Sequence, residues 1–237
     1  MAEAGHDLKA IYVNCSLKRD SGESHTATLM KASAGILEEQ GVSVDWLHMA
    51  SHQIAPGVYP DMTEQGWPTD EWPEIWPRVR DADILVIGTP LWLGEESSLC
   101  RVLIERLYAM SGELNDKGQS LFYGKTGGAI ITGNEDGIKH TSMTLLFALQ
   151  HLGYSIPPQA DCGWIGEAGP GPSFGDKNDD GIRAGFDNGF TKRNCTIMSW
   201  NLIHLARMLK ANSGYPNTGN DRNALNDGEL FGFRLPG

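Results

Sequence analysis

Three short loops of this 237-residue chain carry side chains that suit a phosphorylated planar ligand. Residues 14–26 are rich in hydroxyls, include Lys18 and Arg19, and lead into an amphipathic stretch typical of a helix. Hydroxyl donors, free backbone N–H groups and a helix N-terminus together form an anion site, which suits a phosphate. The loop lacks G-x-G-x-x-G, so a monophosphate is favoured over a dinucleotide pyrophosphate. A loop that only caps a helix is the alternative.

Two further loops offer an aromatic face and a polar edge. Residues 89–94 combine Pro90, Trp92 and Gly94, and an indole face can stack on a heteroaromatic ring. Residues 132–137 are acidic and rich in Gly, and Asn134 with backbone N–H groups can meet the polar edge of such a ring. Core packing of the Trp and plain turn chemistry are the alternatives. In this order, the three loops meet the requirements of a phosphorylated planar cofactor.

The elements that must position these loops are apolar runs with the length of buried strands. We predict strands over residues 10–13, 42–47, 84–88 and 128–132, with a fifth near 160–165. Short continuous apolar runs fit strands that are covered on both faces. Helices are predicted over residues 26–40, 98–110, 141–152 and 194–209. The alternation indicates a three-layer α/β sandwich with a five-stranded parallel sheet, whose ligands bind at the carboxyl ends of the strands.

Three parts of the chain do not fit the alternation. Residues 55–76 are rich in Pro and Trp, and we predict an extended loop with a short helical end. Residues 166–189 are rich in Gly, Pro, Asp and Asn and are predicted to form a long loop. We assign residues 1–165 to the cofactor-binding core, residues 166–211 to a loop and last helix that complete the same domain, and residues 212–237 to a polar tail. The tail is expected to be poorly ordered unless a partner subunit or the sheet holds it.

Composition excludes several classes of protein. The chain has 19 Lys and Arg against 30 Asp and Glu, a net charge of −11, so we expect no binding to nucleic acid or to anionic membranes. No stretch approaches the ~20 apolar residues of a membrane span, and residues 1–9 lack the apolar part of a secretory signal. The four cysteines form no C-x-x-C pair, which predicts reduced, mostly buried thiols and a cytoplasmic protein.

Two motif fragments suggest other sites but lack the necessary context. Residues 124–126 resemble the end of a Walker A loop, but Gly118 lies one residue too far away and the motif precedes a strand. Residues 176–181 resemble the front of a calcium loop, but Asp187 stands where a bidentate Glu is preferred. The seven histidines form no zinc motif. We therefore predict no metal site.

The three loops resemble those of the flavodoxin-like superfamily, in its branch of NAD(P)H-dependent FMN reductases and quinone reductases. The resemblance covers about residues 8–165. It is carried by Asn14-Cys15-Ser16-Leu17-Lys18 with Ser24-His25-Thr26, by Gly88-Thr89-Pro90-Leu91-Trp92-Leu93-Gly94, and by Thr132-Gly133-Asn134-Glu135. It implies that the first loop holds the FMN phosphate, the second lines the ribityl chain and ring, and the third meets the ring from the other side. The implied cofactor-binding residues are Ser16, Lys18, Ser24, His25, Thr26, Pro90, Leu91, Trp92, Leu93, Gly94, Thr132, Gly133, Asn134 and Glu135.

The same resemblance implies a flavodoxin-like strand order and noncovalent FMN. The expected reaction is ping-pong: NADPH or NADH reduces the flavin, and a quinone, free flavin or other small aromatic acceptor reoxidises it. The flavin carries the chemistry, so no acid–base side chain is obligatory. Backbone N–H groups near Asn134 are candidates for stabilising the reduced flavin, and His140 is the candidate proton source for the acceptor. Members are usually dimers or tetramers, so we expect a homodimer or homotetramer.

The alternative is a flavodoxin that passes single electrons to protein partners. The net charge of −11 would suit docking on basic partners. The Trp-rich segment and the long carboxyl-terminal part favour an enzyme with a built pocket. The identity of the acceptor and the choice between NADPH and NADH stay open.

Overall fold

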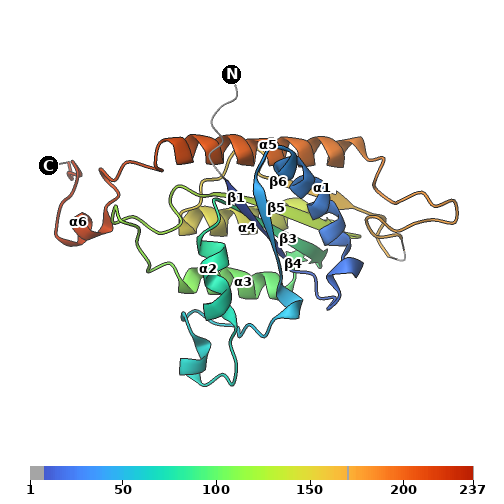
Figure 1. Ribbon diagram of the computed structural model, residues 1–237, viewed down its shortest axis with the longest axis horizontal. Coiled ribbons are helices and arrows are strands. Elements are labelled where there is room, and N and C mark those ends of the chain that lie inside the picture. The colour runs from blue at the N-terminus through green and yellow to red at the C-terminus, as the bar shows by residue number, and fades with distance from the viewer. Residues whose placement is uncertain (1–7, 170, 237) are drawn as a thin grey trace.

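One parallel sheet forms the centre of the molecule, with helices on both faces (Figure 1). The computed structural model describes residues 8–169 and 171–236; residues 1–7 of the predicted core lie outside them. The parallel strands are β1 (Lys9–Asn14), β2 (Ser43–His48), β3 (Ile84–Trp92), β5 (Thr126–Gly133) and β6 (Asp161–Ile165). Their order is β2-β1-β3-β5-β6, and the short β4 (Glu95–Glu96) pairs antiparallel with the end of β3. The predicted α/β sandwich with five parallel strands in flavodoxin-like order is confirmed.

The described residues form six helices. They are α1 (His25–Glu39), α2 (Trp72–Arg80), α3 (Ser98–Ala109), α4 (Ile138–Leu152), α5 (Gly189–Ala211) and α6 (Arg222–Asn226). Short 3₁₀ turns are η1 (Ser21–Glu23), η2 (Met49–Ser51) and η3 (Met62–Gln65). The four predicted helices are all present, and α5 extends further in both directions than its apolar pattern indicates. Its start is set by Asn188, whose side-chain oxygen accepts from the N–H of Thr191.

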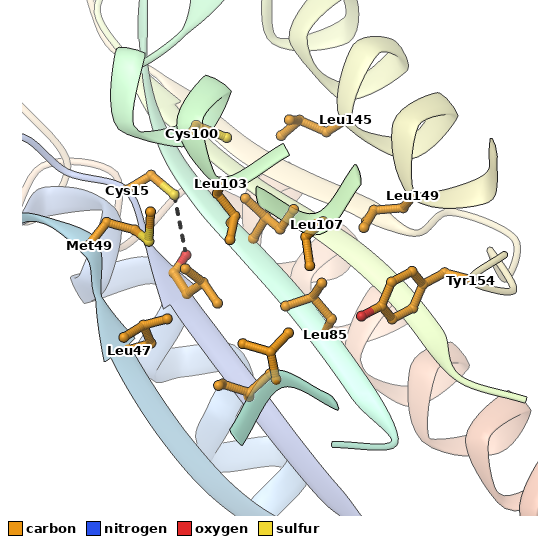
Figure 2. Packing of buried hydrophobic residues seen from close by; sticks show 14 of the residues in the cluster. Cys15, Leu47, Met49, Leu85, Cys100, Leu103, Leu107, Leu145, Leu149 and Tyr154 are labelled. Atoms are coloured by element: carbon orange, nitrogen blue, oxygen red, sulfur yellow. Dashed lines mark hydrogen bonds between the residues drawn. The ribbon is translucent and has the colours of Figure 1, made fainter. Parts of the chain in front are cut away.

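The core has two halves, one on each face of the sheet. Alternate residues of β1 point to opposite faces: Ile11 and Val13 pack with α2, α3 and α4, whereas Ala10 and Tyr12 pack with α1 and α5. Figure 2 shows the first half, where leucines of β2, β3, α3 and α4 meet around the strand surface. Because the central strands are buried on both faces, their sequences are continuous apolar runs.

Two strand predictions need correction. β2 was expected to be covered on both faces, but it is an edge strand in which Asp45 and Trp46 are exposed. β3 was expected to end at Gly88, with a loop over 89–94, but the strand runs to Trp92. Pro90 still pairs in register with Thr132, and Trp92 pairs with Glu95 of β4. Pairing partners on both sides therefore extend a strand that the local sequence interrupts.

The Trp-rich segment is more ordered than a loop with a helical end. It contains η3 and leads into α2, and Asp70 ties it together by accepting from the N–H groups of Ala55 (3.2 Å), Met62 (3.0 Å) and Trp72 (3.2 Å). The same carboxylate pairs with Arg106 of α3 at 2.8 Å, and both side chains are fully buried. The segment is thus fastened to the core by a buried ion pair.

The tail is held by a loop rather than by the sheet. Gln119 donates from its amide nitrogen to the carbonyls of Tyr215 and Pro216, at 3.3 and 2.9 Å, and to the side chain of Asn220 at 2.7 Å. Arg222 donates to the carbonyl of Ser111 at 3.0 Å. No tail residue of the described part joins the sheet.

The remaining structural predictions concern thiols, membranes and metals. All four cysteines are free and buried, as predicted. Among the described residues, none of the helices combines the length and apolar character that crossing a bilayer needs. Within the same residues, there is no cluster of three or more His, Cys, Asp or Glu side chains suited to a metal ion.

Candidate functional site

A cavity of about 700 Å³ opens at the carboxyl ends of β1, β3 and β5, where the three loops meet. This volume lies within the range of small-molecule sites. Eleven of the fourteen predicted cofactor-binding residues line it: Ser16, Lys18, His25, Thr26, Pro90, Leu91, Trp92, Thr132, Gly133, Asn134 and Glu135. Leu17, Gly169, Gly171, Ser173 and Phe174 complete the lining. Loops from separate parts of the chain thus line one cavity.

Asn14, the last residue of β1, organises the first loop. Its side-chain oxygen accepts from the N–H of Ser16 at 3.1 Å and from the hydroxyl of Ser24 at 3.3 Å. The Ser24 hydroxyl in turn caps α1 by accepting from the N–H of Ala27 at 3.1 Å. Ser24 is therefore buried beneath the loop and does not line the cavity. The structure gives it the position of a helix cap, while Ser16 and Thr26 face the cavity.

Lys18 and His25 bring polar and positive character to this end of the cavity. The Lys18 ammonium lies 3.2 Å from His25 Nε2, and His25 Nδ1 lies 3.1 Å from the carbonyl oxygen of Phe174. A carbonyl only accepts and an ammonium only donates, so Nδ1 carries the proton and Nε2 accepts. His25 therefore links the first loop to the segment that follows β6. Together with the α1 N-terminus, the Lys18 charge suits an anion.

The floor of the cavity joins α1 to β5. The hydroxyls of Thr26 and Thr132 lie 2.8 Å apart, and both side chains are buried. Gly133 comes next in β5, and a Cβ there would lie 2.8 Å from Leu91 Cβ. A larger residue at this point would push the ends of β3 and β5 apart. Glycine therefore allows the ends of β3 and β5 to lie close together at the cavity.

The end of β3 carries the predicted aromatic face. Trp92 lines the cavity and is 45% exposed, whereas Leu91 beneath it is 1% exposed. Leu93 and Gly94 form the turn to β4 with φ of 52° and 81°, and neither lines the cavity. The N–H of Leu93 donates to Glu135 at 2.8 Å, and the Thr141 hydroxyl donates to the Gly94 carbonyl at 3.0 Å. The turn is therefore fixed to the loop that follows β5.

His140 lies beside that turn rather than in the cavity. Its Nε2 is 2.9 Å from a carboxylate oxygen of Glu95, and the two side chains are 56% and 54% exposed. It is not among the residues that line the cavity. Its role as a proton source stays a prediction, which this position does not favour.

The segment of residues 166–188 supplies lining that the sequence analysis missed. Gly169, Gly171, Ser173 and Phe174 line the cavity together with the strand ends. Phe174 is buried between Trp164 and Phe186, with ring centroids 5.6 and 5.4 Å apart. The segment follows the carboxyl end of β6, the same sheet edge as the other loops. The rule that located those loops therefore applies here too.

The fold is that of a flavodoxin-like α/β protein, with a cavity at the carboxyl ends of its strands. Residues 8–163 match the family described as NADPH-dependent FMN reductase. The match covers more than half of the chain, and the chain belongs to this family. The predicted recognition is confirmed, and with it the FMN cofactor and NAD(P)H donor typical of the family.

The chain is also similar to individual proteins. A structure of RosB with the bound intermediate 8-demethyl-8-formylriboflavin-5'-phosphate has a TM-score of 0.80 and 32% identity, over 97% of this chain and 90% of that chain. The 8-demethyl-8-aminoriboflavin-5'-phosphate synthase of Streptomyces davaonensis is 35% identical over 209 residues, 86% of this chain and 79% of that protein. A Mycobacterium bovis protein named divalent metal cation transporter MntH is 56% identical over 204 residues, 86% of this chain. The match spans only 29% of that protein's length.

Proposed function

We propose that the protein binds FMN noncovalently in the cavity and reduces a small aromatic acceptor, such as a quinone or a free flavin, with electrons from NADPH or NADH. The observation that carries this proposal is the convergence of three distant loops on one cavity at the strand ends. Family membership supports the flavin and the donor. Bound FMN supplies hydride acceptance and electron release, so the protein's task is binding and orientation.

The residues present fit a flavin phosphate. Ser16, Lys18 and Thr26 offer two hydroxyls and a cation at the α1 N-terminus, which is the donor set that a phosphate needs. Pro90, Leu91 and Trp92 provide an apolar edge along which a ring system can lie. Backbone N–H groups at the end of β5 are the proposed contacts to the polar edge of the ring.

A second candidate function is chemical modification of a riboflavin phosphate. Two of the comparisons, at 32% and 35% identity, carry names with a modified riboflavin-5'-phosphate as bound intermediate or product. The likeness extends over most of this chain and most of each compared chain. In this case the flavin phosphate would be a substrate rather than a resident cofactor.

A titration of the purified protein with FMN, monitored by visible absorbance, tests both candidate functions. One FMN per chain with a perturbed visible spectrum supports a flavin site, and no uptake would refute both. Steady-state oxidation of NADPH in the presence of a quinone then supports the reductase. Chromatography of the flavin after turnover distinguishes unchanged FMN from a modified flavin, which would support the second candidate.

The Lys18→Ala variant tests the contribution of the phosphate to binding separately from that of the ring. We expect FMN affinity to fall about tenfold or more, because a charge-assisted contact is lost, while riboflavin affinity stays unchanged. Equal losses for FMN and riboflavin would contradict a phosphate site at the first loop.

The predicted homo-oligomer has a surface available on α3 and α4. Tyr108, Met143 and Phe147 are between 53% and 68% exposed and border an apolar groove of about 730 Å³. Light scattering after gel filtration measures whether the protein is a dimer, a tetramer or a monomer. The predicted cytoplasmic location likewise stays a proposal.

A further inference from the structure

We propose that Asn134 is a positioning residue: its carboxamide holds residues 171–174 as a wall of the cavity and thereby sets the rate at which FMN leaves. The inference builds on the proposed function. It assigns the Asn134 side chain to the protein's own backbone rather than to the polar edge of the ring.

The carboxamide nitrogen faces three backbone carbonyls of the segment after β6. It lies 3.2 Å from the oxygen of Glu167, 3.2 Å from that of Gly171 and 2.9 Å from that of Pro172. An amide nitrogen has only two hydrogens, so both are shared among these acceptors. The side-chain oxygen lies 3.5 Å from the hydroxyl of Ser173. The Asn134 side chain is thus committed to the segment.

The segment folds closely around this amide. A Cβ at Gly166 would lie 2.7 Å from the Asn134 nitrogen, and a Cβ at Gly171 would lie 2.7 Å from the Glu167 carbonyl. Any side chain at either position would push the carbonyls away from the amide. The glycines therefore let three carbonyls converge on one donor group.

The wall is fastened differently at its other end. Phe174 is buried against Trp164, and its carbonyl accepts from His25. Between the two ends, Gly171 and Ser173 line the cavity. Losing the Asn134 contacts therefore frees the part of the wall farthest from Phe174, while the buried aromatic contact remains.

Two substitutions test this role. Asn134→Ala removes the donor, and Asn134→Asp keeps the shape but presents acceptor oxygens to three carbonyls. We expect each to raise the FMN dissociation rate about tenfold or more, because hydrogen bonds that close the wall are lost or replaced by repulsion.

A matched control lies in the same segment. Asn178 uses its side-chain oxygen to accept from the N–H groups of Asp180 and Ile182, at 3.1 and 2.8 Å, in the exposed turn outside the cavity lining. Asn178→Ala should leave the FMN dissociation rate unchanged.

Hydrogen exchange on FMN-free protein gives a second, independent readout. The amides of Gly171, Ser173 and Phe174 should exchange faster in both Asn134 variants than in wild type. In the Asn178→Ala variant, the exchange of these three amides should not change. The proposal is overturned if both Asn134 variants release FMN at the wild-type rate, or if exchange in residues 171–174 is unaltered. If wild type fails to take up FMN, the proposed function fails, and the exchange measurement still decides whether Asn134 holds the wall.

Discussion

Each of the two irregular segments, residues 55–76 and residues 166–188, is held together by hydrogen bonds to one polar side chain. The two side chains differ in chemistry, since one is a carboxylate and the other a carboxamide. Asp70 collects three backbone N–H groups of the Trp-rich segment and pairs with Arg106, both side chains being fully buried. Asn134 collects three carbonyls of the 166–188 segment with a neutral, half-buried amide.

This difference separates a structural segment from a site segment. A buried ion pair cannot be opened without leaving a charge in apolar surroundings, so the Trp-rich segment behaves as part of the core. A neutral amide near the surface can exchange carbonyls for water at small cost. Accordingly, only the 166–188 segment lines the cavity of the two. The type of anchor indicates which loop can move when a ligand enters.

Removing the charged anchor should have the largest effect. Asp70→Ala leaves Arg106 buried without its counter-charge, and we expect the free energy of unfolding in urea to fall by about 3–5 kcal/mol. Asp61→Ala is the control, because its carboxylate caps η3 by accepting from the N–H and the hydroxyl of Thr63. A loss below about 1 kcal/mol for Asp70→Ala would show that the ion pair does not hold the segment.

Phe174 belongs to the 166–188 segment and is also part of the hydrophobic core, so its removal should affect both stability and binding. Phe174→Ala should lower the free energy of unfolding by about 3 kcal/mol and also weaken FMN binding, since the ring is buried and lines the cavity. Phe186 packs on it but is 42% exposed, so Phe186→Ala should cost less than half as much. Equal losses in urea unfolding would place the core contact elsewhere.

The β3–β4 turn carries backbone strain that both irregular segments avoid. Their positive-φ positions are glycines, whereas Leu93 has φ of 52° and is 90% exposed. Leu93→Asn should raise the free energy of unfolding by about 1 kcal/mol, because Asn tolerates the left-handed region. Leu93→Ala keeps the strain and serves as control. An Asn variant no more stable than the Ala variant would refute stored strain.

The smallest effect is expected when a thiol reagent is added to the native protein, because the cysteines are buried. Burial raises the pKa of the Cys15 thiol well above its usual range, and a hydrogen bond with Cys195, together with burial, raises that of Cys162. Less thiolate is then present at a given pH, so a thiol reagent at pH 8 should react slowly with these two residues until the protein is unfolded. Rapid labelling of either thiol in native protein would show that the core opens locally.

Much of the fold could be predicted because the signals are local. Buried strands such as β1 and β5 appear as apolar runs, and Gly41 and Gly153 mark the ends of α1 and α4. The extension of β3 could not be predicted, because Pro90 disfavours a strand locally and only the neighbours β4 and β5 stabilise it. The exposed edge position of β2 depends likewise on strand order.

For the cavity, residue type and position after a strand were sufficient to predict most of the lining. They were not sufficient for Ser24, which caps α1 beneath the loop, or for Leu93 and Gly94, which turn away at the mouth. Ser173 and Phe174 follow β6 at the same edge of the sheet, but they lie several residues beyond the end of the strand, where position after a strand no longer predicts which residues line a cavity.

The sequence by itself determined the alternation of strands and helices, the edge of the sheet that holds the site and most of the residues around it. These follow from apolar periodicity and loop chemistry, which act over a few residues. Only the tertiary structure decided the contacts of Asn134 and the contact of His25 with Phe174, since these partners lie 33–38 and 149 residues away along the chain. Contacts at such separation depend on how the segments pack, and no local pattern encodes them.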